Sequence, residues 1–252
     1  MIFTNLISTN LRTKIFGQKI EYYQILSSTN EEAWDLIKKG ESKHGMIVIT
    51  DQQQKGKGRG SNSWFMSPSK GLAMSIIIDK TISLNDASLI PIAAGVSVAQ
   101  AIENRGLKPK LKWPNDILIN GKKCGGILCE SKIINRNLIQ MVVGIGLNIN
   151  EATSDFPDEL ISNATSIAIE TGYSHQRELF CAIITTFFER NFEELKMSPE
   201  IWIKYCNHLH KSVSFKYNDK KYSGVFSGLD NNGYAQIDLD GTIKTFPSII
   251  LD

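Results

Sequence analysis

The chain has 252 residues and a formal net charge of +2, with 42% hydrophobic and 21% charged residues. These values are ordinary for a folded globular protein and allow one mid-sized domain with a small second domain. Strong non-specific nucleic-acid binding needs clustered cations, and a net charge of +2 does not imply a large cationic face. No apolar run approaches the roughly 20 residues of a membrane span. The N-terminus has no signal-peptide core, so we expect a cytoplasmic protein without a membrane segment.

The first part of the chain alternates apolar segments with polar loops. Residues 27–39 are predicted to form a helix, in which Thr29 and Glu32 have the spacing of a capping box. Apolar strands are expected at 45–50 and 72–79, separated by a polar, glycine-rich, basic loop. A long insert of this kind inside a compact domain is usually functional or disordered.

Two long helices and several strands are predicted in the middle of the chain. Residues 84–105 form one helix with Ser83 as its N-cap, and 174–195 form another with an apolar face. Asn120-Gly121 is a strong signal for a two-residue hairpin, because both turn residues must tolerate positive φ. Strands are expected at 110–113, 117–119, 123–129 and 138–147.

Short strands separated by turn-forming residues follow Asn207, and this pattern predicts a small all-β barrel. The chain is therefore divided into a larger domain, 1–206, and a small one, 207–252. The larger domain is expected to be α/β (α+β), a mixed sheet with flanking helices, because helices and hairpins alternate irregularly. The small domain's strands are expected at 213–217, 220–228, 233–239 and 242–246.

The four cysteines do not form a metal-binding pattern. Cys124 and Cys129 are close in sequence, but no second Cys/His pair at metal-site spacing accompanies them. Together with Cys181 and Cys206, they are expected to be free structural thiols in a reducing compartment.

The sharpest local feature is Gly56-Lys57-Gly58-Arg59-Gly60. Alternating glycines let backbone N–H groups approach an anion, and the interleaved cations would neutralise it. The segment matches neither the P-loop pattern nor a good GxGxxG fingerprint. Taken alone, it is as consistent with a flexible surface loop as with an anion site.

Three further motifs combine polar groups with restricted backbone. In KWPND, from Lys112, Asp116 could be an Mg²⁺ ligand, although taken alone the segment is better explained as an Asn-Asp turn. In KKCGG, from Lys122, a lysine entering a core must find an anion, although a solvent-exposed pair is the alternative. In GIGLNIN, from Gly144, small residues and an amide suit a ligand contact, and helix–strand packing is an equal alternative.

The order and spacing of these motifs is more specific than any one of them. Together with Ser28-Thr29-Asn30, the segments GKGRGSNSW, KWPNDI, KKCGGILCE and GIGLNIN resemble those of biotin–protein ligases, over roughly residues 20–246. The segment GVFSGLDNNGYAQIDLDG, from Gly224, resembles the small SH3-like C-terminal domain of that family. The resemblance implies a catalytic domain related to class II aminoacyl-tRNA synthetases.

The resemblance also implies a reaction. Biotin and MgATP would form biotinyl-5'-AMP and pyrophosphate, and a lysine of a biotin carboxyl carrier domain would then take the biotinyl group and release AMP. ATP, Mg²⁺ and biotin are thus the expected ligands. The implied catalytic residues are Lys123, Arg59 and Asp116, of which Asp116 is also the candidate metal ligand.

The resemblance implies two further sets of site residues. The biotin-binding set is Ser28, Thr29, Asn30, Gln53, Gly56, Lys57, Gly58, Arg59, Lys123 and Gly126. The nucleotide-binding set is Lys57, Arg59, Trp64, Asn115, Lys123 and Asn148.

The chain departs from the family pattern at several positions. Lys57, Ser61 and Asn62 replace residues that are usually arginine or glycine, and lysine cannot make the planar two-point contact of arginine. We therefore expect a more mobile loop with weaker retention of the adenylate. Met66 is an extra residue, and the end of the chain lacks the usual glycine-rich closing segment.

Partners are inferred from the same resemblance. Because the biotin-site segment begins at Ser28, the preceding residues cannot hold the DNA-binding domain of some members, and we expect no sequence-specific DNA binding. Relatives often dimerise through the central sheet, so a homodimer is possible, with the apolar strand 138–147 as a candidate edge.

Two other functions are compatible with parts of the pattern. A lipoate–protein ligase or octanoyl transferase shares the catalytic fold, but lipoate has no ureido ring for Gln53 and the Ser28–Asn30 segment to bind. A non-catalytic biotin-binding regulator would not need both Lys123 and Asp116.

Overall fold

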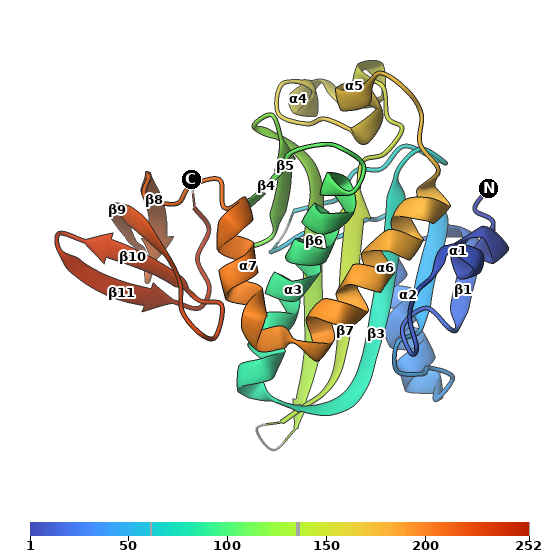
Figure 1. Cartoon of the computed structure of the whole chain (residues 1–252), viewed down its shortest axis with the longest axis horizontal. Coiled ribbons are helices and arrows are strands. Elements are labelled where there is room, and N and C mark those ends of the chain that lie inside the picture. Colours follow the sequence, from blue (N-terminus) through green and yellow to red (C-terminus); the bar gives the residue numbers. More distant parts are fainter. Residues whose placement is uncertain (61, 135–136, 252) are drawn as a thin grey trace.

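The computed structural model describes residues 1–60, 62–134 and 137–251. Ser61, one of the loop departures, lies outside the described residues. Within these ranges, the large sheet has the strand order β1-β2-β3-β7-β6-β5-β4 (Figure 1). Its strands are β1 Ile20–Leu26, β2 Ile47–Gln53, β3 Leu72–Ser83, β4 Pro109–Lys112, β5 Asp116–Ile119, β6 Lys122–Ile134 and β7 Asn137–Leu147.

The sheet is mixed, as predicted. Strands β1 and β2 pair in parallel, and every other neighbouring pair of this sheet is antiparallel. Strand β7 lies between β3 and β6, so the suggestion that 138–147 could be an edge strand is wrong. A strand this apolar gains most by being paired along both sides, and the edges are formed instead by β1 and β4.

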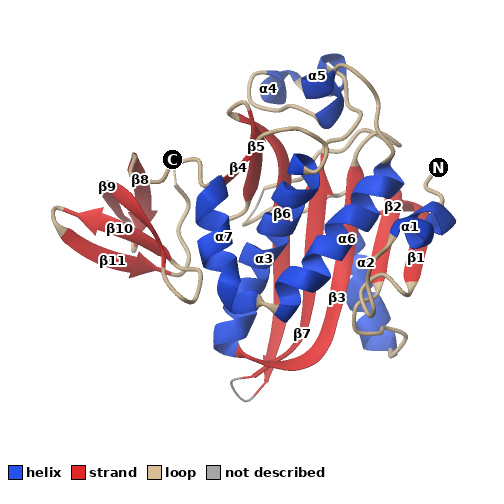
Figure 2. Ribbon diagram, in the orientation of Figure 1, coloured by secondary structure: helices blue, strands red, loops and turns tan. Residues whose placement is uncertain are grey.

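Helices cover both faces of the large sheet (Figures 1 and 2). On one face lie α3 (Leu84–Glu103), α6 (Arg177–Glu193) and α7 (Ser198–Tyr205), and α2 (Thr29–Lys39) lies on the other. The remaining helices are α1 Thr4–Asn10, α4 Asp158–Ile161, α5 Ile167–Thr171, η1 Thr153–Asp155 and η2 Leu195–Met197. None of the helices of the described residues is long and apolar enough to cross a membrane.

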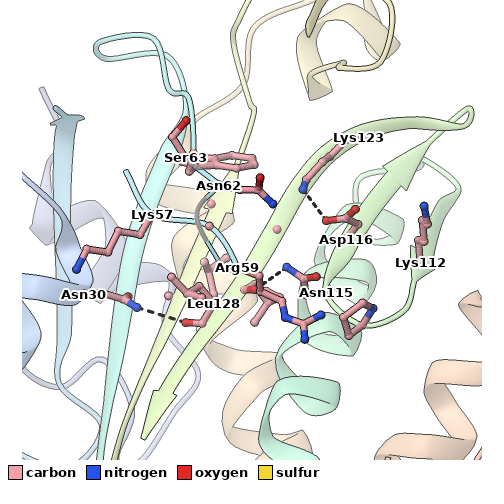
Figure 3. Close-up of a pocket in the computed structure, with 18 of the residues that line it drawn as sticks. Asn30, Lys57, Arg59, Asn62, Ser63, Lys112, Asn115, Asp116, Lys123 and Leu128 are labelled. Carbon is pink, nitrogen blue, oxygen red and sulfur yellow. Dashed lines mark hydrogen bonds and ion pairs between the residues drawn. The ribbon is translucent and has the colours of Figure 1, made fainter. Parts of the chain in front are cut away.

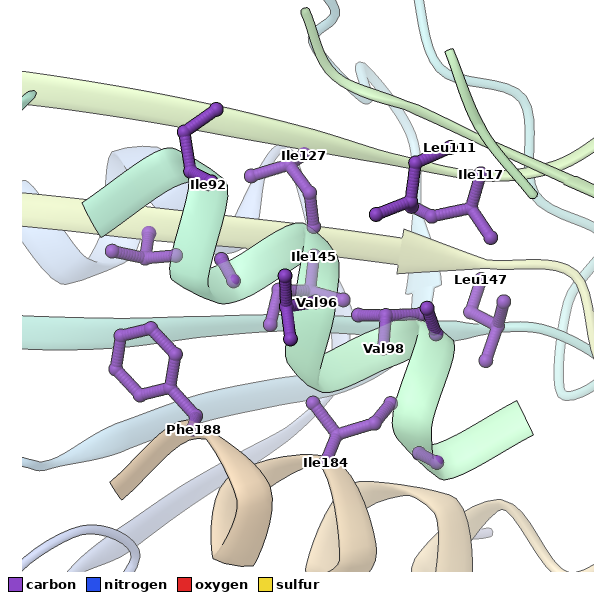
Figure 4. Close-up of a cluster of buried hydrophobic side chains, with 14 of the residues drawn as sticks. Ile92, Val96, Val98, Leu111, Ile117, Ile127, Ile145, Leu147, Ile184 and Phe188 are labelled. Atoms are coloured by element: carbon purple, nitrogen blue, oxygen red, sulfur yellow. The ribbon is translucent and has the colours of Figure 1, made fainter. Parts of the chain in front are cut away.

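The main core lies between the sheet and α3, which is itself covered by α6 (Figure 4). Helix α3 is buried around most of its circumference, and this explains its nearly continuous apolar sequence. Successive residues of a strand point to opposite faces, so Ile47 and Ile49 join the main core whereas Val48 packs under α2. The cluster under α2 consists of Ala33, Leu36, Met46, Val48, Ile77 and Val142.

The start of α2 differs from the prediction. Ser28 is its N-cap and makes no side-chain cap hydrogen bond, so the predicted capping box is wrong. The carboxylate of Glu32 accepts a hydrogen bond from Tyr23 (2.9 Å), and Thr29 bonds to Gln53 instead. The polar groups at this helix start are thus directed toward neighbouring strands.

Other local predictions are confirmed. Ser83 caps α3 by accepting from the Asp86 amide, and the hairpin residues Asn120 and Gly121 have φ values of 48° and 80°. The helix expected at 174–195 begins at Arg177 and ends at Glu193. Helix α1 and strand β1 were not predicted. The four cysteines are free thiols, as expected.

The C-terminal strands form a separate antiparallel sheet with the order β11-β10-β9-β8 (Figure 2). Trp113 Nε1 donates to the carbonyl of Gly233 (3.3 Å) and so joins this sheet to the β4–β5 turn. The exact boundary at Asn207 remains a prediction. The strands are β8 Ser212–Tyr217, β9 Lys220–Leu229, β10 Ala235–Leu239 and β11 Thr242–Phe246.

Candidate active site

The motifs meet around one cavity of about 180 Å³ at the end of the large sheet (Figure 3). Its walls come from the start of α2, the glycine-rich loop, the β4–β5 turn, β6, β7 and the C-terminal segment. Most of the predicted site residues lie here, although they are widely separated in sequence. The predicted residues that line the cavity are Ser28, Thr29, Asn30, Gln53, Lys57, Gly58, Arg59, Trp64, Asn115, Asp116, Lys123 and Gly126.

A buried hydrogen-bond network forms one side of the cavity. The Thr29 amide donates to Gln53 Oε1 (2.8 Å), and Ser75 Oγ lies 2.7 Å from both Thr29 Oγ1 and Asn30 Oδ1. Among the described residues, no partner occupies Gln53 Nε2 or Ser28 Oγ. These two groups are therefore free to bind a neutral polar ligand such as a urea or amide.

The carboxamide of Asn30 is held from both ends. Its Oδ1 contacts Ser75, and its Nδ2 donates to Glu130 Oε2 (2.8 Å). A Cβ at position 144 would lie 2.3 Å from Asn30 Oδ1, so only glycine fits there. Both ends of the Asn30 carboxamide thus have partners within the protein, and its predicted contact with biotin stays a prediction.

The glycine-rich loop folds into a tight turn. The Gly58 amide donates to the Asn62 carbonyl (2.8 Å), and the Trp64 amide donates to the Gly56 carbonyl (2.8 Å). Gly56 itself does not line the cavity, and a Cβ there would lie 2.4 Å from the Trp64 carbonyl oxygen. Glycine is therefore needed at position 56 because a side chain there would prevent this turn.

The two cations of the loop are held by different parts of the chain. Lys57 Nζ lies 2.8 Å from Glu31 Oε1 of α2, and this hydrogen-bonded pair raises the pKa of Lys57 and lowers that of Glu31. Arg59 donates to Ser248 Oγ (3.1 Å) and is half buried, which lowers its pKa from the usual range. Figure 3 shows Lys57 directed away from Lys123, and Arg59 below the Lys123–Asp116 pair in this view.

An ion pair occupies the far side of the cavity. Lys123 Nζ lies 2.5 Å from Asp116 Oδ1, and their side chains are 42% and 28% exposed. The preceding Asn115 donates from Nδ2 to the Ile127 carbonyl (3.0 Å), which fixes the β4–β5 turn against β6. The turn contains a cis Trp113–Pro114 peptide bond. The KWPND and KKCGG motifs thus form one charged unit.

Trp64 closes the cavity over two glycines of the sheet. A Cβ at position 146 would lie 2.5 Å from Trp64 Cε2, whereas one at position 126 would lie 3.7 Å from Trp64 Cζ3. The indole Nε1 is buried and has no hydrogen-bond partner among the described residues. Gly146 therefore makes room for the indole, whereas a Cβ at position 126 would make only an ordinary contact with it.

Asn148 lies away from the cavity. It is buried, and its Nδ2 donates to the Thr165 carbonyl (3.0 Å), so its amide ties β7 to the loop before α5. Its predicted contact with the nucleotide stays a prediction that this position does not favour.

The site fits a magnesium ion only when a ligand supplies most of the oxygens. Asp116 is the one carboxylate among the described residues that line the cavity, and no group of three metal-binding side chains occurs in the part of the chain described. Mg²⁺ commonly binds one or two carboxylates together with substrate phosphates. A phosphate-bearing ligand is therefore required.

Several residues of the site were not predicted. Ser75 and Glu130 complete the network around Asn30, and Lys112, Ile250 and Leu251 line the cavity. The single serine within an otherwise apolar strand was a signal for Ser75. No comparable signal indicated that the C-terminal segment would return to the cavity.

Comparison with known proteins places the chain among enzymes of biotin attachment. The profile of the Biotin/lipoate A/B protein ligase family matches residues 22–148. The bifunctional ligase/repressor BirA of Bacillus subtilis is 32% identical over 244 residues, which cover 94% of this chain and 75% of the relative. The biotin–[acetyl-CoA-carboxylase] ligase of Paracoccus denitrificans is 26% identical, covering 74% of this chain and 81% of the relative.

A solved structure agrees with the sequence matches. The biotin protein ligase from Aquifex aeolicus in complex with biotin and ATP superposes with a TM-score of 0.79 and is 26% identical. The match covers 93% of this chain and 99% of that chain. The similarity thus includes both sheets.

Proposed function

The chain belongs to the Biotin/lipoate A/B protein ligase family, and on that premise we propose how its cavity attaches biotin to an acceptor protein. The activity is that of an ATP-dependent biotin–protein ligase. One observation supports the assignment of roles: the same cavity is lined by neutral polar groups and by the Lys123–Asp116 pair together with Arg59.

The neutral side suits the ureido ring of biotin. Ser28 and Gln53 offer groups that the described residues leave unpaired, and the network around Thr29 fixes their surroundings. A site built for hydrogen bonding discriminates strongly against ligands that lack the matching groups. Lipoate has no ureido ring and would leave these groups unpaired.

The charged side suits the first chemical step. An oxygen of the biotin carboxylate attacks the α-phosphorus of ATP, the bond from this phosphorus to the bridging oxygen breaks, and pyrophosphate leaves with the electron pair. Two anions must approach each other, and Lys123 and Arg59 supply opposing charge at the place where negative charge develops.

Magnesium is the implied cofactor, and Asp116 would hold it together with ATP phosphates. When bound, the ion would add charge neutralisation on the phosphates. Asp116→Ala should then raise the Mg²⁺ concentration needed for half-maximal activity. An unchanged magnesium titration would make Asp116 a partner of Lys123 alone.

The second step transfers the acyl group. The neutral amine of an acceptor lysine attacks the acyl carbon of biotinyl-5'-AMP, the bond to AMP breaks, and the amine loses a proton. The loop around Arg59 and Trp64 covers the cavity and would limit hydrolysis of the mixed anhydride. We propose that the acceptor is the biotin carboxyl carrier domain of a biotin-dependent carboxylase.

Intact-mass analysis of a purified carrier domain tests the function. The domain is incubated with the protein, biotin and MgATP, and one biotinyl increment that disappears without ATP is the expected result. Excess lipoate should not compete with biotin. Pyrophosphate release without a mass increment would contradict the proposed acceptor, and the absence of both would contradict the ligase activity.

A further inference from the structure

A second cavity, of about 430 Å³, adjoins the first. It lies between the β4–β5 end of the large sheet and the segment that leads from α7 into β8. The two cavities share Lys112, Asp116, Lys123 and Leu251 in their linings. The Lys123–Asp116 pair therefore separates the reaction cavity from a second space, and a ligand could extend across it.

The second cavity is positively charged. Lys112 and Lys211 line it, and neither has an ion-pair partner among the described residues. Asp116 is the one carboxylate that lines it in the described part of the chain, and Lys123 already neutralises that charge. Two lysine charges are thus uncompensated next to the reacting centre.

His208 adds an unused hydrogen-bonding group. It is only 7% exposed, lines the cavity, and neither of its ring nitrogens has a partner among the described residues. Its ring is held edge-on against Phe226, with centroids 4.2 Å apart. Burial, together with Lys112 and Lys211, lowers the pKa of His208 to about 4, so the imidazole is neutral and keeps one N–H donor.

Buried polar groups nearly always have a partner, so the unpaired imidazole of a residue that lines the cavity indicates a ligand with acceptor oxygens. We propose that this cavity binds the pyrophosphate released in the first step, with Lys112 and Lys211 balancing its charge and His208 donating one N–H. This proposal rests on the proposed function and adds the segment before β8 to the reaction machinery.

The charge pattern favours pyrophosphate over the acceptor lysine as the occupant. An approaching lysine side chain would meet two unpaired ammonium groups of the same sign, whereas a polyanion would be attracted by them. As the bond to the α-phosphorus breaks, negative charge grows on the leaving group. Lys112 lines both cavities, whereas Lys211 lines only the second one, and Ser28 and Gln53 of the neutral biotin side line only the first.

The reverse reaction measures pyrophosphate binding directly. Enzyme carrying preformed biotinyl-5'-AMP is mixed with inorganic pyrophosphate, and ATP formation is followed over a single turnover. Lys211→Met should raise the half-saturating pyrophosphate concentration roughly tenfold or more, since hydrogen bonds to charged groups are among the stronger ones. Lys211→Arg should stay near wild type, because it keeps the charge.

Lys216→Met is the matched control, because Lys216 is an exposed lysine of β8 that lines neither cavity. The KM for biotin should be unchanged in all three variants. An unchanged half-saturation value in Lys211→Met would overturn the subsite. Failure of the wild-type protein to form any adenylate would instead overturn the proposed function, and this proposal with it.

Discussion

Asn30 Nδ2 donates a hydrogen bond to Glu130 Oε2 across 2.8 Å, joining the first turn of α2 to β6. The bond fixes which end of the Asn30 carboxamide faces Ser75, and it thereby sets the order of donors and acceptors beside Thr29 and Gln53. A carboxylate outside the cavity thus positions the groups that would receive the ureido ring.

We expect Glu130→Ala to weaken biotin binding about tenfold, since a hydrogen bond to a charged group contributes about 1.5–3 kcal/mol and part of this is recovered by rearrangement. Glu130→Gln keeps an acceptor for Asn30 Nδ2 and should weaken binding less. Titration calorimetry with biotin measures both, and the KM for ATP should not change. If Glu130→Ala binds biotin with wild-type affinity, the hydrogen bond from Asn30 to Glu130 is not needed for biotin binding.

Lys123→Met should reduce adenylate formation by at least about 100-fold while leaving the fold intact, because the lost charge acts at the reacting centre. Its ion-pair partner Asp116 is 28% exposed on its side chain, so removing the lysine leaves no fully buried charge. The rate of pyrophosphate release and the thermal midpoint are the two measurements. A stable variant with wild-type rates would remove Lys123 from the site.

Alanine substitutions at the two glycines that face Trp64 form a matched pair that tests packing against the indole. Gly146→Ala places a Cβ 2.5 Å from Trp64 Cε2, and we expect a loss of about 1–3 kcal/mol in unfolding free energy from overpacking. Gly126→Ala makes only ordinary contacts, its nearest neighbour being 3.7 Å away, so it should keep the stability but reduce biotin binding. Urea unfolding and biotin titration separate the effects. Equal stability of both variants would contradict the packing argument.

Glu151 should make stability depend on pH. It is fully buried, neither carboxylate oxygen has a partner among the described residues, and burial raises its pKa from 4.5 to about 7. The folded state therefore binds a proton that the unfolded state has lost between pH 4.5 and 7. Stability from this group is present below pH 4.5 and falls as pH rises to about 7, by at most about 1.4 kcal/mol per pH unit.

Glu151→Gln should flatten this part of the stability profile, measured by urea unfolding between pH 4.5 and 8. Glu159→Gln changes an exposed carboxyl group and serves as the control. A wild-type slope that survives in Glu151→Gln would assign the pH dependence to another group.

Lys57 tests the expected weak retention of the adenylate. Its ammonium lies 2.8 Å from Glu31, whereas an arginine could keep that contact and make a second one to a phosphate. Lys57→Arg should slow the release of biotinyl-5'-AMP a few-fold, by stopped-flow measurement, relative to Lys55→Arg, an exposed lysine outside the cavity lining. Identical release rates would discard the idea.

The sequence by itself determined the local structure and the family. Asn120-Gly121 specified a hairpin and Ser83 a helix start, because such turns and caps depend on the backbone preferences of neighbouring residues. The order of the glycine-rich, KWPND and KKCGG segments resembles that of biotin–protein ligases, and this resemblance implied the reaction.

Only the tertiary structure decided which distant groups meet. Asn30 and Glu130 are 100 residues apart, and Arg59 and Ser248 are 189 apart. The capping-box prediction was wrong because Thr29 found a better partner on β2, and strand 138–147 became central because the sheet order surrounded it. Contacts of this kind depend on strand order, register and packing, and no local preference encodes them.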